Sequence, residues 1–119
     1  MTQKLSEHFS REEFACKCGC GFDVVDAQLL EMLEDIRTRF NKPVKINSAA
    51  RCPTHNKAVG GGERSQHLLG KAADIVIEGE QPGYVGSYVE AKKPTSFGIG
   101  VYETFTHVDS RSERARWRG

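Results

Sequence analysis

Apolar side chains recur every three or four positions over residues 29–40, with acidic and basic side chains between them. This spacing predicts an amphipathic helix, because positions three and four apart share one helix face. Asp26 is placed to cap the first turn, and the Asn-Lys-Pro sequence at 41–43 marks the end. A capping-box pattern at residues 10–13 predicts a second, short helix near the start of the chain.

The remaining apolar pattern favours strands separated by turns and loops. Alternation or short apolar runs predict strands over residues 44–47, 72–77, 98–101 and 105–109. Residues 81–92 have the pattern of a helix that Gly83 and Gly86 weaken. The stretch 51–70 is rich in Pro, Gly, Asn and Ser, so it predicts a long loop with a helical turn at 53–58. Helices that precede and separate antiparallel strands indicate a small α+β domain, an antiparallel sheet with flanking helices.

Length and charge narrow the classes of function. A chain of 119 residues is predicted to form one domain over residues 1–119, with the cysteine-rich segment 1–25 packed on it. Seventeen basic and sixteen acidic side chains give a net charge of +1, which argues against a nucleic-acid or anionic membrane partner. We expect a monomer. Residues 1–8 lack the apolar run of a signal peptide, so synthesis in the cytoplasm is expected.

Two histidines and one aspartate stand out as candidate metal ligands. His67 precedes Asp74 by seven residues where a loop leads into an apolar strand, and His107 lies on a distant strand. Two nitrogen donors and one oxygen donor suit a catalytic zinc ion, because three protein ligands leave one tetrahedral position open. Taken singly, each residue has an ordinary structural explanation, so only the three together indicate a metal site.

The pattern Ser65-x-His67-x-x-Gly70-x-Ala72-x-Asp74, followed by His107, resembles the zinc D,D-peptidases of the M15 family. That family includes D-alanyl-D-alanine carboxypeptidases, vancomycin-resistance dipeptidases, phage endolysins and the zinc domain of hedgehog proteins. The resemblance continues through residues 46–53, 56–61, 97–102 and 114–117. It implies a hedgehog-like or D,D-peptidase-like fold.

The same resemblance implies a zinc-dependent hydrolase that cleaves an amide bond in peptidoglycan stem peptides, as a carboxypeptidase or as an endopeptidase of the endolysin type. His67, Asp74 and His107 match the zinc ligands of the family. Arg51 matches the arginine that stabilises the oxyanion or holds the substrate carbonyl, and Ser65 matches a substrate contact. Such an enzyme would act on the cell wall after release or export by another route.

The general base departs from the family pattern. Many relatives carry an acid or a histidine two or three positions before the last ligand, where this chain has Phe105 and Thr104. Strand alternation offers Asp109 and Glu103 as substitutes, with Asp109 slightly preferred. The pattern favours equally a role in which Asp109 orients the imidazole of His107. Without a base, the domain would be a non-catalytic zinc module that recognises wall peptides or a protein partner.

Four cysteines, Cys16, Cys18, Cys20 and Cys52, have three open interpretations. Two disulfides, one disulfide with two thiols, and a structural zinc site all fit the residues. The Cys-Lys-Cys-Gly-Cys spacing differs from the usual zinc knuckle, so a second ion is not the favoured interpretation. We expect a structural link between the N-terminal segment and the Cys52 loop. The basic tail 111–118 is expected to pack its Trp117 ring and to be otherwise solvated.

Overall fold

The computed structural model describes residues 3–119. Its elements in chain order are η1 (Arg11–Glu13), α1 (Ala27–Phe40), β1 (Lys45–Ser48), α2 (Pro53–Ala58), η2 (Gln66–Leu69), β2 (Ala72–Val76), α3 (Pro82–Lys92), β3 (Gly98–Val101), β4 (Thr106–Asp109) and β5 (Ala115–Arg118). The predicted α+β class is confirmed. Every predicted helix and strand is present within one or two residues of its expected bounds. The helices within residues 3–119 are all too short or too polar to cross a membrane.

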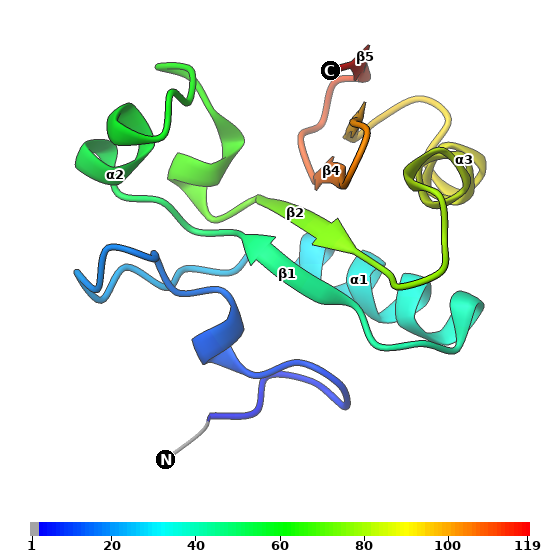
Figure 1. Ribbon diagram of the computed structural model, residues 1–119, viewed down its shortest axis with the longest axis horizontal. Coiled ribbons are helices and arrows are strands. Elements are labelled where there is room, and N and C mark those ends of the chain that lie inside the picture. Colours follow the sequence, from blue (N-terminus) through cyan, green and yellow to red (C-terminus); the bar gives the residue numbers. More distant parts are fainter. Residues whose placement is uncertain (1–2) are drawn as a thin grey trace.

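The five strands form one sheet in the order β1-β2-β4-β3-β5 (Figure 1). The β1–β2, β2–β4 and β3–β4 pairs are antiparallel, as predicted. The prediction of a purely antiparallel sheet was wrong at one edge, because β5 pairs with β3 in parallel. A parallel pair needs a crossover connection, and here the β4 strand and the turn after it return the chain to the far side of β3.

The core lies between one face of the sheet and helices α1 and α3. Helix α1 is capped by Asp26, whose carboxylate accepts from the amides of Gln28 and Leu29, and is followed by Asn41 in the left-handed conformation. Its buried face joins side chains of the sheet and of α3 in one cluster. That cluster includes Leu29, Met32, Leu33, Ile36, Ile46, Ala73, Ile75, Val85, Val89, Ile99 and Val108. Burial of each large aliphatic side chain stabilises the fold by about 1.5–3 kcal/mol.

Strand alternation sends a second set of side chains to the opposite face of the sheet. Ala73 and Ile75 on β2 lie in the core, so Asp74 between them points away from it. On β4, Val108 lies in the core, and His107 and Asp109 flank it on the other face. The polar face of the central strands therefore carries two of the three predicted ligands.

The segment before α1 packs against this unit through two aromatic rings. Phe9 and Phe14 are buried and meet edge to face, with ring centroids 6.0 Å apart. The predicted capping box is present at η1, where the Ser10 amide donates to the Glu13 carboxylate at 2.8 Å. The Phe14 carbonyl accepts from the Ala50 amide at 3.0 Å, which joins this segment to the chain directly after β1.

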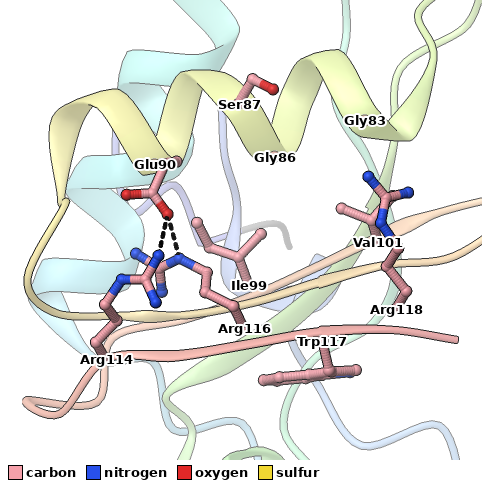
Figure 2. Close-up of a pocket in the computed structure, with 10 residues that line it drawn as sticks. All are labelled: Gly83, Gly86, Ser87, Glu90, Ile99, Val101, Arg114, Arg116, Trp117 and Arg118. Carbon is pink, nitrogen blue, oxygen red and sulfur yellow. Dashed lines mark hydrogen bonds and ion pairs between the residues drawn. The ribbon is translucent and has the colours of Figure 1, made fainter.

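The C-terminal tail is more ordered than the sequence predicted. Figure 2 shows Arg114 and Arg116 of the β5 segment both reaching Glu90 on α3, across a shallow hollow. Arg116 also donates to the carbonyls of Lys93, Ser96 and Phe97. Residues 112–114 and 118 are exposed, as expected. The expectation of an otherwise solvated tail was wrong at Arg116, because this side chain bonds the carbonyls of the turn before β3 and holds β5 in place.

Candidate metal centre

His67 is held by the short turn η2. The Ser65 hydroxyl accepts from the His67 amide at 3.2 Å, and Gly70 ends the turn in the left-handed conformation. The His67 side chain is 3% exposed, and its Nδ1 lies 2.7 Å from the Ala49 carbonyl oxygen. Because a carbonyl only accepts, Nδ1 carries the hydrogen and the Nε2 lone pair is free to bind a metal.

Asp74 and His107 are brought together by the register of the β2–β4 pair, in which they are direct partners. The His107 Nδ1 lies 2.9 Å from Asp74 Oδ1, and the His67 Nε2 lies 3.3 Å from the same oxygen. The three donor atoms are all within 4.8 Å of one another. Zinc bonds of about 2.0–2.1 Å place tetrahedral ligand atoms about 3.3–3.4 Å apart, so these donors fit a zinc ion after small adjustments.

The second nitrogen of His107 faces Asp109. Its Nε2 lies 2.7 Å from Asp109 Oδ2, and Asp109 is fully buried. The Gly98 amide donates to Asp109 at 3.1 Å, and the Arg111 guanidinium donates twice, at 2.7 and 2.8 Å. A carboxylate this firmly held keeps the hydrogen of His107 on Nε2, which leaves Nδ1 as the metal ligand.

The centre is electrostatically prepared for a cation. Burial raises the pKa of Asp74, but bonds from His107 and His67 outweigh it and hold that pKa well below its usual range. Burial likewise raises the pKa of Asp109, and His107 and Arg111 more than reverse the effect. Burial lowers the pKa of His107, whereas the Asp109 and Asp74 carboxylates raise it to a greater extent. Both carboxylates are therefore ionised and ready to balance a metal charge.

Arg51 lies beside the predicted ligands. Its Nη2 is 3.2 Å from Asp74 Oδ2, its Nε donates to the Ser48 hydroxyl at 3.0 Å, and its Nη1 donates to Asn56 at 3.3 Å. Gly61 leaves room for this arrangement, since a side chain there would collide with Asn56. The Arg51 side chain is 13% exposed, so a fixed positive charge borders the centre.

A cavity of about 370 Å³ opens over these residues. Its lining includes the predicted site residues Arg51, Ser65, His67, Asp74 and His107. The glycine run 60–62 forms part of its wall. Two predicted catalytic carboxylates are outside the lining: Asp109 is buried behind His107, and Glu103 is exposed in the β3–β4 turn. Within residues 3–119, Asp74 is the one carboxylate that lines this cavity.

A family model described as Peptidase M15 matches residues 7–109, a range that contains all three predicted ligands. The chain belongs to the M15 peptidase family. Among curated proteins, none matches the chain. M15 peptidases are zinc-dependent metallopeptidases, so membership agrees with the donor set at His67, Asp74 and His107 and implies a peptide-like substrate.

One row of residues across the sheet builds the floor of this M15 site. Strand register places Ser48, Asp74, His107, Gly100 and Trp117 opposite one another on successive strands. A side chain at Gly100 would collide with the Trp117 indole, and that indole lies 5.0 Å from the His107 ring between centroids. The Trp117 role was missed from the sequence. Its signal was the Gly-Ile-Gly sequence in a strand, since glycine there indicates a close neighbour.

Other lining residues of the M15 cavity were also missed, among them Tyr102 and Arg111. Tyr102 and Arg111 both line it, and the Trp117 Nε1 donates to the Tyr102 hydroxyl at 2.9 Å. Arg111 lies over the Trp117 ring at 5.4 Å from its centroid while it holds Asp109. Neither residue follows a ligand-like spacing, so only the fold shows that they belong to the site.

Proposed function

We propose that this M15 family member is a zinc-dependent peptidase that hydrolyses an amide bond in peptidoglycan stem peptides, as a D,D-carboxypeptidase or an endolysin-type endopeptidase. The observation that carries the proposal is the convergence of His67 Nε2, Asp74 Oδ1 and His107 Nδ1 in an open cavity. Each histidine has its other nitrogen engaged, by the Ala49 carbonyl or by Asp109. Such orientation is what a metal site requires of its ligands.

A zinc ion held by these three residues supplies Lewis-acid polarisation of the amide carbonyl and makes water more acidic. Arg51 supplies a fixed positive charge beside the centre, held by Asp74, Ser48 and Asn56. We assign it to the negative charge that develops on the carbonyl oxygen during amide hydrolysis. Ser65 lines the cavity next to His67, and we assign its hydroxyl to substrate contact.

The proton acceptor is assigned by comparing two carboxylates. Asp109 accepts from His107, Gly98 and Arg111 and is fully buried, which favours a positioning role over proton transfer. Glu103 is exposed in the turn between β3 and β4, close in sequence to Tyr102 and Phe105, which both line the cavity. We therefore place the acceptor role on Glu103, which would turn inward when substrate is bound.

The cavity walls suit a short peptide. Tyr102 and Phe105 stack with ring centroids 4.3 Å apart, and Trp117 continues this aromatic wall. Arg51 and Arg111 offer positive charge to carboxylate groups of the substrate, which stem peptides carry. Access to wall peptides would follow release of the protein from the cell or export by another route.

A second candidate function is a non-catalytic zinc module that binds wall peptides or a protein partner. It is favoured by one observation, that Asp74 is the only carboxylate lining the cavity in the described part of the chain. A metal-binding cavity that lacks a proton acceptor would bind peptide without cleaving it.

Digestion of purified peptidoglycan, with mass detection of released peptides and elemental analysis of the protein, separates these functions. Wild type is compared with His67→Ala, and His55→Ala outside the cavity serves as the matched histidine control. If the protein is a peptidase, wild type and His55→Ala should release defined stem-peptide fragments. His67→Ala should lose one zinc ion and release no fragments. Zinc bound through His67 without cleavage of any wall substrate would overturn the peptidase proposal in favour of the binding module.

A further inference from the structure

The side chains of all four cysteines converge. Three of them lie within five residues of one another, and Cys52 joins them from a distant loop. Their Sγ atoms are all within 4.8 Å of one another, and all four are free thiols. The Cys16–Cys18, Cys18–Cys52 and Cys16–Cys52 sulfur separations are 3.4, 3.6 and 3.9 Å. The predicted meeting of the N-terminal segment with the Cys52 loop is therefore present as a cluster of four thiols.

These separations match a metal site better than a pair of disulfides. A disulfide bond holds its two sulfurs about 2.05 Å apart, so two disulfides would give two close pairs of sulfurs. In this cluster, three sulfurs are instead nearly equally spaced. Zinc–sulfur bonds of about 2.3 Å place tetrahedral sulfurs about 3.8 Å apart. The observed values of 3.4 to 3.9 Å lie around that spacing.

The backbone explains how such a compact sequence can surround one ion. Gly19 and Gly21 have φ values of 82° and 92°, which side chains rarely allow, so the chain can fold back around Cys18 and Cys20. The Cys16 amide donates to the Phe22 carbonyl at 2.8 Å and closes this turn. The Cys-Lys-Cys-Gly-Cys sequence can therefore surround one ion, although its spacing differs from the usual zinc knuckle.

Backbone amides also point at the sulfurs. The Cys52 amide lies 3.4 Å from Cys16 Sγ, and the His55 amide lies 3.4 Å from Cys52 Sγ. Amide donors of this kind orient metal-bound thiolates and offset their negative charge. Cys16 is 4% exposed and Cys18 and Cys20 are exposed, so an ion at this point would be shielded on one side and reachable from the other.

We propose that Cys16, Cys18, Cys20 and Cys52 hold a second zinc ion, which is structural and fixes Arg51 at the edge of the catalytic cavity. Four thiolates form a closed tetrahedral site with no open position for substrate, and zinc prefers this donor set. Cys52 directly follows Arg51, whose amide donates to the His67 carbonyl at 3.0 Å. The ion therefore joins the N-terminal segment to the residue that carries the cavity's positive charge.

Metal stoichiometry tests the proposal separately from peptidase activity. Elemental analysis of reduced, purified wild type is expected to give two zinc ions per chain. The variant His67→Ala with His107→Ala is expected to keep one, and Cys18→Ser with Cys20→Ser is expected to lose the other. Lys17→Ala is the matched control, because Lys17 lies between two cysteines, is exposed and offers no thiol. One zinc ion in wild type, lost only with the histidines, would overturn the proposal.

Cobalt substitution identifies the donor set and does not depend on the cysteine variant folding. Cobalt-loaded His67→Ala with His107→Ala is expected to show the thiolate-to-cobalt charge-transfer bands and strong visible bands of a tetrahedral tetrathiolate. Titration of that protein with a mercurial thiol reagent should release one metal ion as four thiols react. Absence of these bands, or a mass lower by the hydrogens of one or two disulfides, would contradict the proposal. Neither result bears on whether the His67 centre cleaves peptides.

Discussion

Gly98 and Asp109 are direct partners in the β3–β4 hairpin, and the Gly98 amide donates to Asp109 Oδ1 at 3.1 Å. Position 98 tolerates no side chain, because a Cβ there would collide with the Asp109 carboxylate. That carboxylate cannot move aside easily, since His107 and Arg111 also bind it. The absence of a side chain at Gly98 thus leaves room for the Asp109 carboxylate, which in turn bonds the candidate ligand His107.

Gly98→Ala is expected to weaken zinc binding at the His67 centre by about 10-fold or more, because Asp109 would lose its hold on His107. Overpacking should also destabilise the fold by about 1–3 kcal/mol. Competition with a chromogenic chelator measures the affinity, and urea unfolding of the metal-free protein measures the stability. Gly83→Ala is the control, because a Cβ there meets nothing within 4 Å. Unchanged zinc affinity in Gly98→Ala would show that Asp109 does not orient His107.

Asp109→Asn separates a positioning role from proton transfer. The asparagine oxygen can still accept from His107 but carries no charge, so zinc affinity is expected to fall by about 10–100-fold. Turnover of stem peptides should return when zinc is added to saturation. A loss of kcat that persists at saturating zinc would instead make Asp109 the proton acceptor.

Glu103→Gln is the complementary variant. We expect full zinc binding and little change in KM, with a large loss of kcat and of the acidic limb of the pH profile. The Glu103 side chain is exposed, so thermal unfolding of the variant should match that of wild type. Wild-type kcat in Glu103→Gln would remove it from the mechanism.

The sequence predicted three candidate ligands, and the structure brings them together, because the fold places a loop and two paired strands side by side. Asp74 and His107 each lie on a strand whose alternation fixes the side-chain direction, and the register then makes them neighbours. Helix α1 was equally predictable, since Asp26 and a regular apolar face specify it within one segment. The α+β class followed from the order of these elements.

The missed features depend on contacts between distant segments. The sequence of residues 115–118 is that of a charged tail, but these residues pair with β3 as a strand, and Glu90 and the turn before β3 bind Arg116. The place of Trp117 over His107 depends on that strand and on Gly100. Asp109 is assigned to positioning, and Glu103 to proton transfer, because Arg111 binds Asp109. Strand alternation in the sequence does not predict this contact.

The attachment of β5 can be tested at Arg116. Arg116→Ala would leave the carbonyls of Lys93, Ser96 and Phe97 without this donor, which is expected to destabilise the fold by about 1–3 kcal/mol. Urea unfolding measures the change. Arg118→Ala, an exposed arginine on the same strand, should change stability by less than about 0.5 kcal/mol. Equal effects from the two variants would mean that the Arg116 bonds contribute no specific stability.

The attachment of the N-terminal segment to α1 predicts a pH dependence of stability. The Glu34 carboxylate accepts from the Ser6 hydroxyl, from the His8 amide at 2.8 Å and from the His8 ring at 2.7 Å. Burial raises the pKa of Glu34, but these bonds outweigh it and hold the pKa below its ordinary value. A depressed folded-state pKa gives stability that is present above the unfolded pKa of about 4.3 and is lost as pH falls through the folded value.

Glu34→Gln should therefore be less stable than wild type at pH 7, and the difference between the two proteins should shrink as pH falls below about 4. Urea unfolding at a series of pH values, in metal-free protein, gives this difference directly. Glu7→Gln is the matched control, because Glu7 is exposed and makes no hydrogen bond or ion pair within the described residues. A difference that stays constant from pH 7 to pH 3 would mean that the Glu34 charge does not hold the N-terminal segment. In that case the buried rings of Phe9 and Phe14 would account for its attachment.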